Sequence, residues 1–215
     1  PLAALDEERK AEILPFVEHL RDEFAIPILW VSHSVDEVAR LAATVVRMDH
    51  GRVAAIGTPA EVLSPSFAAH GADRFGAVSV LTGRVAAVDP TYGVTHVDHP
   101  AGRIVVPALL PAAAGPIRVT VGATDVTLAR AATDPGTTSV RTALSGRIGA
   151  ITSDDGPFAL VRVDLDGGER LWAYATRLAV DALALGHGEP VTALIKAVSI
   201  DERTLAAAPP ARGGA

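Results

Sequence analysis

The chain has 215 residues, enough for one large domain or two small ones. Its formal net charge of −6 argues against a general nucleic-acid binder, which would carry a basic face. The absence of cysteine excludes disulfides and thiolate metal sites. No apolar run approaches the roughly 20 residues of a membrane-spanning helix, and no signal peptide is recognised. We therefore expect a soluble, cytoplasmic protein.

The first predicted element is a helix over residues 7–24, where apolar residues recur at close to helical spacing. Asp6 is a suitable N-cap, because its carboxylate can accept hydrogen bonds from the first free N–H groups of the helix. Pro15 lies inside the pattern and predicts a kink or a break.

Residues 26–31 are apolar, rich in branched side chains and too few for a helix, which predicts a buried parallel strand. Ser34, with Glu37 three positions later, predicts the N-cap and capping box of a helix over about 35–42. His33 then stands at the carboxyl end of the strand, where open α/β sheets bind ligands.

Two short strands follow at 44–48 and 52–56, joined by a turn in which Gly51 can take positive φ. Thr58, Pro59 and Glu61 have the order of an N-cap, a first helical residue and a third-position acid, which predicts a short helix that ends near residue 64. Residues 65–77 lose this periodicity and are interpreted as a linker.

Together these elements resemble the end of the nucleotide-binding domain of an ABC transporter. In that family a D-loop, here ending at Asp6, precedes a helix, and a switch histidine, here His33, ends a later strand. The resemblance implies that His33 positions the γ-phosphate and the attacking water, and that Asp6 meets the opposing nucleotide-binding domain. The plainer alternatives are helix capping for Asp6 and a strand-end imidazole satisfied by backbone for His33.

The chain contains no G-x-x-x-x-G-K-[ST] phosphate loop, no Leu-Ser-Gly-Gly-Gln signature and no Walker B pair. A triphosphate therefore has no cradle of loop amides and lysine here. We expect this polypeptide alone to be inactive as an ATPase, whereas an intact parent would bind ATP and Mg²⁺ and hydrolyse the ATP.

An internal repeat occupies the second part of the chain. Residues 81–88 recur as 144–151, an offset of 63, and Val119-Thr120 recurs more loosely as Val191-Thr192, an offset of 72. Two copies of a five-strand unit predict two OB-like barrels, about 78–135 and 139–202. Residues 207–215 are predicted to be a disordered tail.

Ser139 and Arg141 precede the first strand of the second copy, and Lys196 closes that copy. This pattern resembles the oxyanion-binding Mop-type repeat of molybdate proteins, which has Ser-x-Arg at its start and Ile-Lys-(Ser/Ala) near its end. The resemblance implies that these three residues, with Thr176 as a further candidate, bind molybdate or tungstate. Guanidinium, ammonium and hydroxyl groups suit a tetrahedral dianion.

The sequence departs from that pattern at Ala197, where binding members often have serine, and at Ala179, which supplies no hydroxyl. Each missing donor removes up to roughly 1.5–3 kcal/mol toward a charged partner. In the first copy Thr124-Asp125 is predicted to occupy the place of Lys196-Ala197, which leaves only the second copy as an anion site. The alternative is that Arg141 and Lys196 are solvated or ion-paired on a barrel that contacts its dimer mate.

No metal site is predicted. His96 and His99 would face opposite sides of a strand, and the scattered histidines are interpreted as surface side chains.

The predicted fold class is an α/β remnant, the C-terminal part of an ABC nucleotide-binding domain (1–64), followed by an all-β regulatory domain of two OB-like repeats (78–206). The resemblance implies a homodimeric ATP-binding subunit of a molybdate importer, peripheral on the cytoplasmic face of the plasma membrane and joined to permease subunits. Two alternatives are a non-enzymatic oxyanion-binding or dimerisation module and a fragment of a sugar-importer ATPase. A phosphate loop encoded upstream would favour the ATPase, and sugar-operon neighbours would favour the sugar importer.

Overall fold

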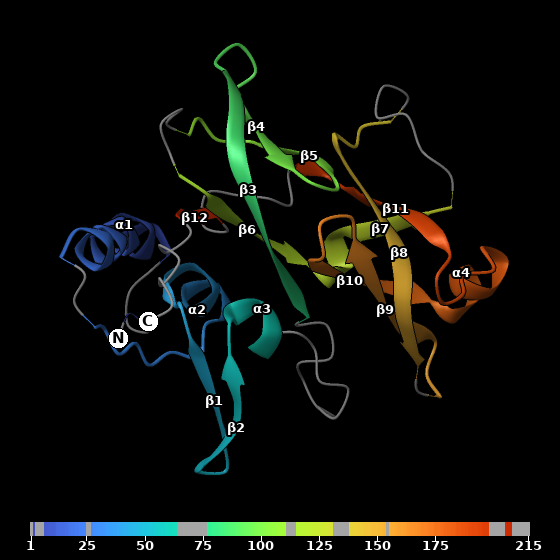
Figure 1. Ribbon diagram of the computed structural model, residues 1–215, viewed down its shortest axis with the longest axis horizontal. Coiled ribbons are helices and arrows are strands. Elements are labelled where there is room, and N and C mark those ends of the chain that lie inside the picture. The colour runs from blue at the N-terminus through green and yellow to red at the C-terminus, as the bar shows by residue number, and fades with distance from the viewer. Residues whose placement is uncertain are drawn as a thin grey trace.

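The structure is a computed structural model, and two parts are distinguishable in it (Figure 1). It describes residues 2, 7–24, 27–63, 77–110, 115–130, 138–153, 155–197 and 205–207. The helical part contains α1 (Glu7–Phe24), α2 (Val35–Leu41) and α3 (Pro59–Val62), with a separate two-stranded hairpin of β1 (Val45–Asp49) and β2 (Arg52–Gly57). This order of elements after residue 34 is the predicted one.

The predicted parallel strand at 26–31 is wrong. Residues 27–32 belong to no strand, and Leu29 and Val31 are 91% and 75% exposed. A strand forms only when a neighbour pairs with its backbone, and the described residues offer this apolar segment no such neighbour.

Helix α1 continues through Pro15, so the predicted break is wrong. One side of α1 packs through Leu14 against Leu41 of α2 and against Leu2, with Trp30 at the edge of this small cluster. Glu18 of α1 also accepts two hydrogen bonds from the Arg40 guanidinium, at 2.6 and 3.0 Å. Helices α1 and α2 therefore form one packed pair.

The predicted N-caps at Ser34 and Thr58 are present, but only the second is a complete capping box. Thr58 and Glu61 bond reciprocally, and Pro59 stands first in α3. The hydrogen bonds from the Thr58 backbone and then the Thr58 hydroxyl lower the pKa of Glu61. This cap therefore contributes above the ordinary pKa of a glutamate and is lost as the pH falls through the lowered value. At α2, Ser34 accepts from the Glu37 N–H, but the Glu37 carboxylate bonds elsewhere.

The second part is built from two five-stranded sheets, in the orders β12-β6-β3-β4-β5 and β10-β9-β8-β11-β7. The elements are β3 (Val78–Asp89), β4 (Val94–His99), β5 (Gly102–Val106), β6 (Ile117–Gly122), η1 (Ala123–Asp125), β7 (Val126–Ala129), β8 (Thr142–Ser153), β9 (Phe158–Leu165), β10 (Arg170–Thr176), α4 (Arg177–Ala182), β11 (Pro190–Ile195) and β12 (Leu205–Ala207). Among the described residues strands therefore predominate, as predicted.

The two sheets exchange their last strands. Strand β7 follows the first repeat along the chain but pairs with β11 of the second, and β12 follows the second repeat but pairs with β6 of the first. The prediction of two barrels, each built from its own residues, is therefore amended. Buried side chains of both repeats, such as Leu81 and Leu144, belong to a single core.

The sequence repeat with an offset of 63 residues corresponds to a long, bulged strand that occurs twice in the fold. Strands β3 and β8 each have twelve residues, and their bulges fall between Val85 and Ala87 and between Ile148 and Ala150, at the same offset. Gly83 is one of the glycines of this repeat, and a Cβ there would collide with Val97 and the Asp98 carbonyl of the neighbouring strand. The bulge lets one long strand bend and pair with different neighbours along its two halves.

A partly buried polar contact also joins the two repeats: the His99 side chain is 1% exposed and that of Glu169 is 33% exposed. His99, predicted to be a surface histidine, is 7% exposed, and its Nε2 lies 2.7 Å from Glu169 Oε2. Its Nδ1 accepts the Ala101 N–H, so the ring proton lies on Nε2 and is donated to Glu169. The same carboxylate accepts the Thr82 N–H, which places a residue of the second repeat between two strands of the first.

Replacement of Glu169 by alanine leaves the His99 and Thr82 N–H groups without their acceptor. We expect the free energy of unfolding, measured by urea denaturation with circular dichroism, to fall by about 2–4 kcal/mol. Asp98→Ala is the matched control, since its ion pair with Arg103 is exposed on both sides and should contribute less than about 1 kcal/mol. Equal losses in the two variants would contradict a buried tie.

The helical part is joined to the β part through α2. Arg118 of β6 donates to the Ala42 and Ala39 carbonyl oxygens at 2.7 and 3.2 Å, and Arg21 of α1 donates to the Leu41 carbonyl at 3.0 Å. Burial, and secondarily the charge of Arg21, lower the pKa of Arg118. Two arginines from different parts of the fold thus bind the negative end of α2.

Candidate functional sites

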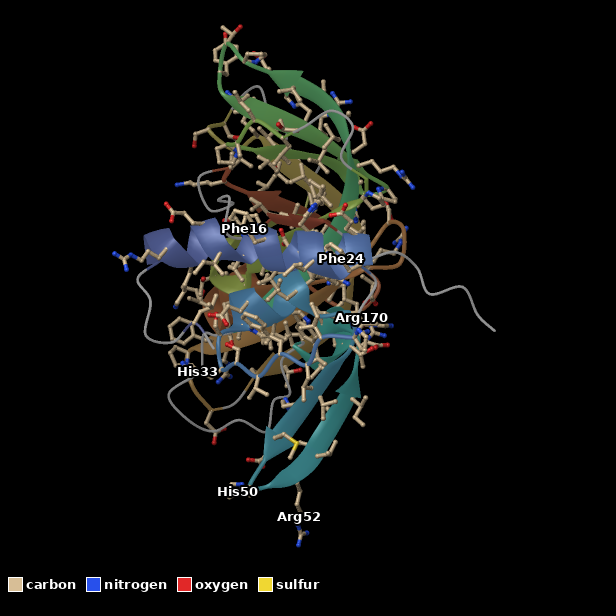
Figure 2. The ribbon with its side chains drawn as sticks, turned by 90° about the vertical axis from the view of Figure 1, so that its left-hand side faces the viewer. Phe16, Phe24, His33, His50, Arg52 and Arg170 are labelled. Atoms are coloured by element: carbon tan, nitrogen blue, oxygen red, sulfur yellow. The ribbon has the colours of Figure 1, made fainter. Side chains whose placement is uncertain are left out.

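The first site is the turn that carries His33, directly before α2. The residue is exposed, and in Figure 2 it lies on the left-hand side, above His50 at the tip of the hairpin. Among the residues that the structure describes, none donates to or accepts from its ring. Within the described part of the chain, the alternative of a ring satisfied by backbone therefore finds no support.

Side chains on both sides of His33 are tied together. Glu37 Oε2 accepts from Ser32 Oγ at 2.7 Å and from Trp30 Nε1 at 3.2 Å. The Ser34 N–H donates to Ser32 Oγ at 3.1 Å. The sequence reasoning found Glu37 only as a helix cap and missed this role, because its partners lie on the segment predicted to be a strand.

The second residue of this site, Asp6, lies outside the described residues. Helix α1 begins at Glu7, as the proposed cap requires, but the cap itself stays a prediction.

The candidate anion ligands of the second repeat lie at one end of the β8–β11 ladder. The last pair of that ladder joins Thr142 to Ile195. Arg141 and Lys196 each lie one residue beyond this pair and are therefore neighbours. Both are exposed, as is Ser139. Arg141 Nη1 donates to the Thr138 carbonyl at 2.8 Å, which holds its guanidinium near the start of the strand.

Thr176 lies elsewhere. It pairs with Phe158, next to the end of β8 that lies farthest from Arg141 and Lys196. Its hydroxyl accepts the Ala179 N–H at 3.1 Å and so caps α4. Within one copy of the chain Thr176 cannot share an anion with the other three residues, and it could join them only from a second copy.

The strand register corrects the prediction of which residues in the first repeat correspond to Lys196-Ala197. Leu81 pairs with Val119 and Leu144 pairs with Ala193, so the two ladders correspond at an offset of 74 rather than 72. Gly122-Ala123, and not Thr124-Asp125, therefore stands in the place of Lys196-Ala197. The first repeat therefore has glycine where the second has Lys196, and it lacks that positive charge. Among the described residues, Arg141 and Lys196 of the second repeat are the candidate pair of cations.

Neither a metal centre nor a membrane span is found in the described part of the chain. No three histidine or acidic side chains gather there as a metal ion would require. None of its helices is long and apolar enough to cross a bilayer.

Comparison with known proteins agrees with the fold of the β part. Residues 138–201 match the family model of the TOBE domain. The structure also resembles a solved structure of the cytoplasmic molybdate-binding protein ModG with molybdate bound, with a TM-score of 0.50 and 25% identity, over 60% of this chain and 96% of that one. Residues 138–201 of the β part thus match a TOBE domain, and the β part as a whole consists of two OB-like sheets.

Over nearly its whole length the chain is similar to molybdenum import ATP-binding proteins named ModC. It is 40% identical to that of Rhizobium etli over 94% of this chain and 55% of the relative, and 41% identical to that of Mesorhizobium japonicum over 98% and 56%. The protein of Rhizobium meliloti is 43% identical over 94% and 56%. The chain spans about half the length of these relatives and is ModC-like in the manner of their C-terminal portion.

Proposed function

We propose that the chain is the C-terminal part of an ATP-binding subunit that couples ATP hydrolysis to molybdate uptake. The similarity to molybdenum import ATP-binding proteins over 94% of the chain carries this proposal. In such a subunit His33 would position the γ-phosphate and the attacking water, and Asp6 would meet the opposing nucleotide-binding domain. The phosphate loop that holds ATP and Mg²⁺ would lie outside these 215 residues.

The exposed apolar surface beside His33 supports the proposal. Leu29 and Val31 are almost bare, and Phe16 and Phe24 on α1 are 70% and 59% exposed (Figure 2). An interface with another part of the protein would cover these exposed apolar side chains. The part of the relatives that this chain does not span would supply the protein surface that covers these side chains. In the assembled importer two such subunits would form a homodimer on the cytoplasmic face of the plasma membrane and drive permease subunits.

The role of His33 is tested in a protein of the relatives' full length that contains this chain. His33→Ala should lower the kcat of ATP hydrolysis by about 100-fold or more, because one well-placed group toward the transferred phosphoryl is lost. The measurement is steady-state phosphate release. His50→Ala, at another exposed histidine, on the hairpin tip, should leave kcat unchanged.

The 215-residue chain by itself is the blank in this assay and should give no turnover. Equal activities of the His33→Ala and His50→Ala proteins, or multiple turnovers by the chain alone, would contradict the proposal.

We also propose that the TOBE-type domain binds an oxyanion such as molybdate or tungstate through Ser139, Arg141 and Lys196. Their convergence at one end of the β8–β11 ladder and the likeness to a molybdate-binding protein support this second role. Two cations and a hydroxyl would match the charge and the donor needs of a tetrahedral dianion. Such binding requires no ATP and would persist in the chain alone.

Calorimetric titration of the whole chain with molybdate tests the anion site. We expect saturable heat, and affinities at least about tenfold weaker in Arg141→Ala and in Lys196→Ala, since each removes a charge-assisted hydrogen bond. Arg103→Ala, an exposed arginine of the first repeat, should bind like the unmodified chain. The absence of heat at millimolar molybdate, or equal losses in all three variants, would contradict the assignment.

A further inference from the structure

We infer that Glu37 is a positioning residue for His33: its carboxylate fixes the turn on which the imidazole stands and ties that turn to α1. The inference rests on the proposed role of His33 in phosphate handling.

The turn has no backbone ladder to hold it. Residues 27–34 belong to no strand, so the usual means of fixing a residue at the end of a β-strand is missing among the described residues. What holds the segment is the side-chain network of Glu37, which binds Trp30 and Ser32 before His33 and, through Ser32 Oγ, the N–H of Ser34 after it. His33 therefore lies between two anchored neighbours.

The burial of Glu37 gives this network its strength. The residue is 4% exposed, and a buried carboxylate is costly unless donors surround it. Ser32 and Trp30 supply two donors to Oε2, and Lys10 Nζ of α1 lies 4.0 Å from Oε1. Any displacement of the turn would strip donors from a desolvated charge, which makes one arrangement of the turn much more favourable than others.

The contact with Lys10 extends the same constraint to α1, the helix that begins one residue after Asp6. Together with the Glu18–Arg40 pair, this contact holds the turn of His33 and the helix that follows Asp6 in one arrangement. In phosphoryl transfer, where catalysis is chiefly positioning, a displacement of about 1 Å can cost on the order of 100-fold in rate.

The test is water-exchange NMR on the whole chain, following the Trp30 indole N–H and the Ser34 amide. The sequence has only two tryptophans, so the Trp30 indole signal is assigned by its loss in Trp30→Phe. Glu37→Leu should speed the exchange of both groups by about tenfold or more, because it removes the acceptor on which the network depends. Glu37→Gln keeps an acceptor oxygen and should restore exchange to within about threefold of the unmodified chain.

Glu18→Leu is the matched control. Glu18 is a largely buried carboxylate between α1 and α2, but its hydrogen bonds are with Arg40 and not with residues 30–34. It should lower stability without speeding exchange at Trp30 and Ser34. If Glu18→Leu speeds their exchange as much as Glu37→Leu does, the effect is general loosening of the helix pair and the inference is overturned.

Ser32→Ala keeps the inference testable should Glu37→Leu fail to fold. It removes one donor to Glu37 and the acceptor of the Ser34 N–H, and should speed Ser34 exchange by about tenfold. Unchanged exchange in Ser32→Ala would overturn the inference.

All of these measurements need no nucleotide, so their outcome is separate from that of the His33→Ala assay. If His33 proves dispensable for ATP hydrolysis while Glu37→Leu frees the turn, the proposed function fails and the geometric role stands. If the turn is unaffected, the positioning role fails whatever the ATPase assay gives.

Discussion

The exchange of edge strands between the two β-sheets is the constraint on which the rest of the molecule depends. Strand β7 completes the sheet of the second repeat and β12 completes that of the first, so neither sheet has its full set of strands without the other. The buried side chains of both repeats accordingly form one core, and polar contacts such as that between His99 and Glu169 cross between them. A β domain of this construction resists separation into halves.

The helical part depends on the same constraint. Helix α2 lies against β6 and β12, and Arg118 of β6 binds its carboxyl end. At its other end, α2 begins directly after Ser34. Its third residue, Glu37, holds the turn that carries His33. A short helix is therefore fixed at one end by the exchanged sheet and at the other by a buried carboxylate. The proposed anion site and the proposed phosphate-handling histidine thus belong to one connected structure.

The parts of the fold that local chemistry determines were predictable from the sequence. The Thr58–Glu61 box, the N-cap at Ser34 and the turn at Gly51 need only neighbouring residues, and all three are present. The repeat at residues 81 and 144 also corresponds to one unit formed twice, in which the glycine and the bulge of β3 recur in β8 at the same offset.

The predictions that proved wrong concern features that depend on residues far away in the sequence. An apolar stretch at 26–31 has the composition of a buried strand, but burial requires a sheet that these residues do not find. Strand exchange cannot be read from a repeat, because β7 and β12 follow their own repeats in sequence and pair with the other. His99 was interpreted as a surface residue because its acceptor, Glu169, lies 70 positions away. Among the candidate ligands that the family resemblance implied, Arg141 and Lys196 lie side by side at one end of a ladder, whereas Thr176 lies toward the other end of β8.

Native-state hydrogen exchange of the backbone amides tests most directly whether the β domain and the helix behind His33 form one unit. The account predicts that α2 exchanges with nearly the same opening free energy as β6 in the unmodified chain, and that Arg118→Ala speeds α2 by about tenfold or more while β6 is unchanged. Exchange of α2 that is orders of magnitude faster than that of β6, and that Arg118→Ala does not alter, would contradict it.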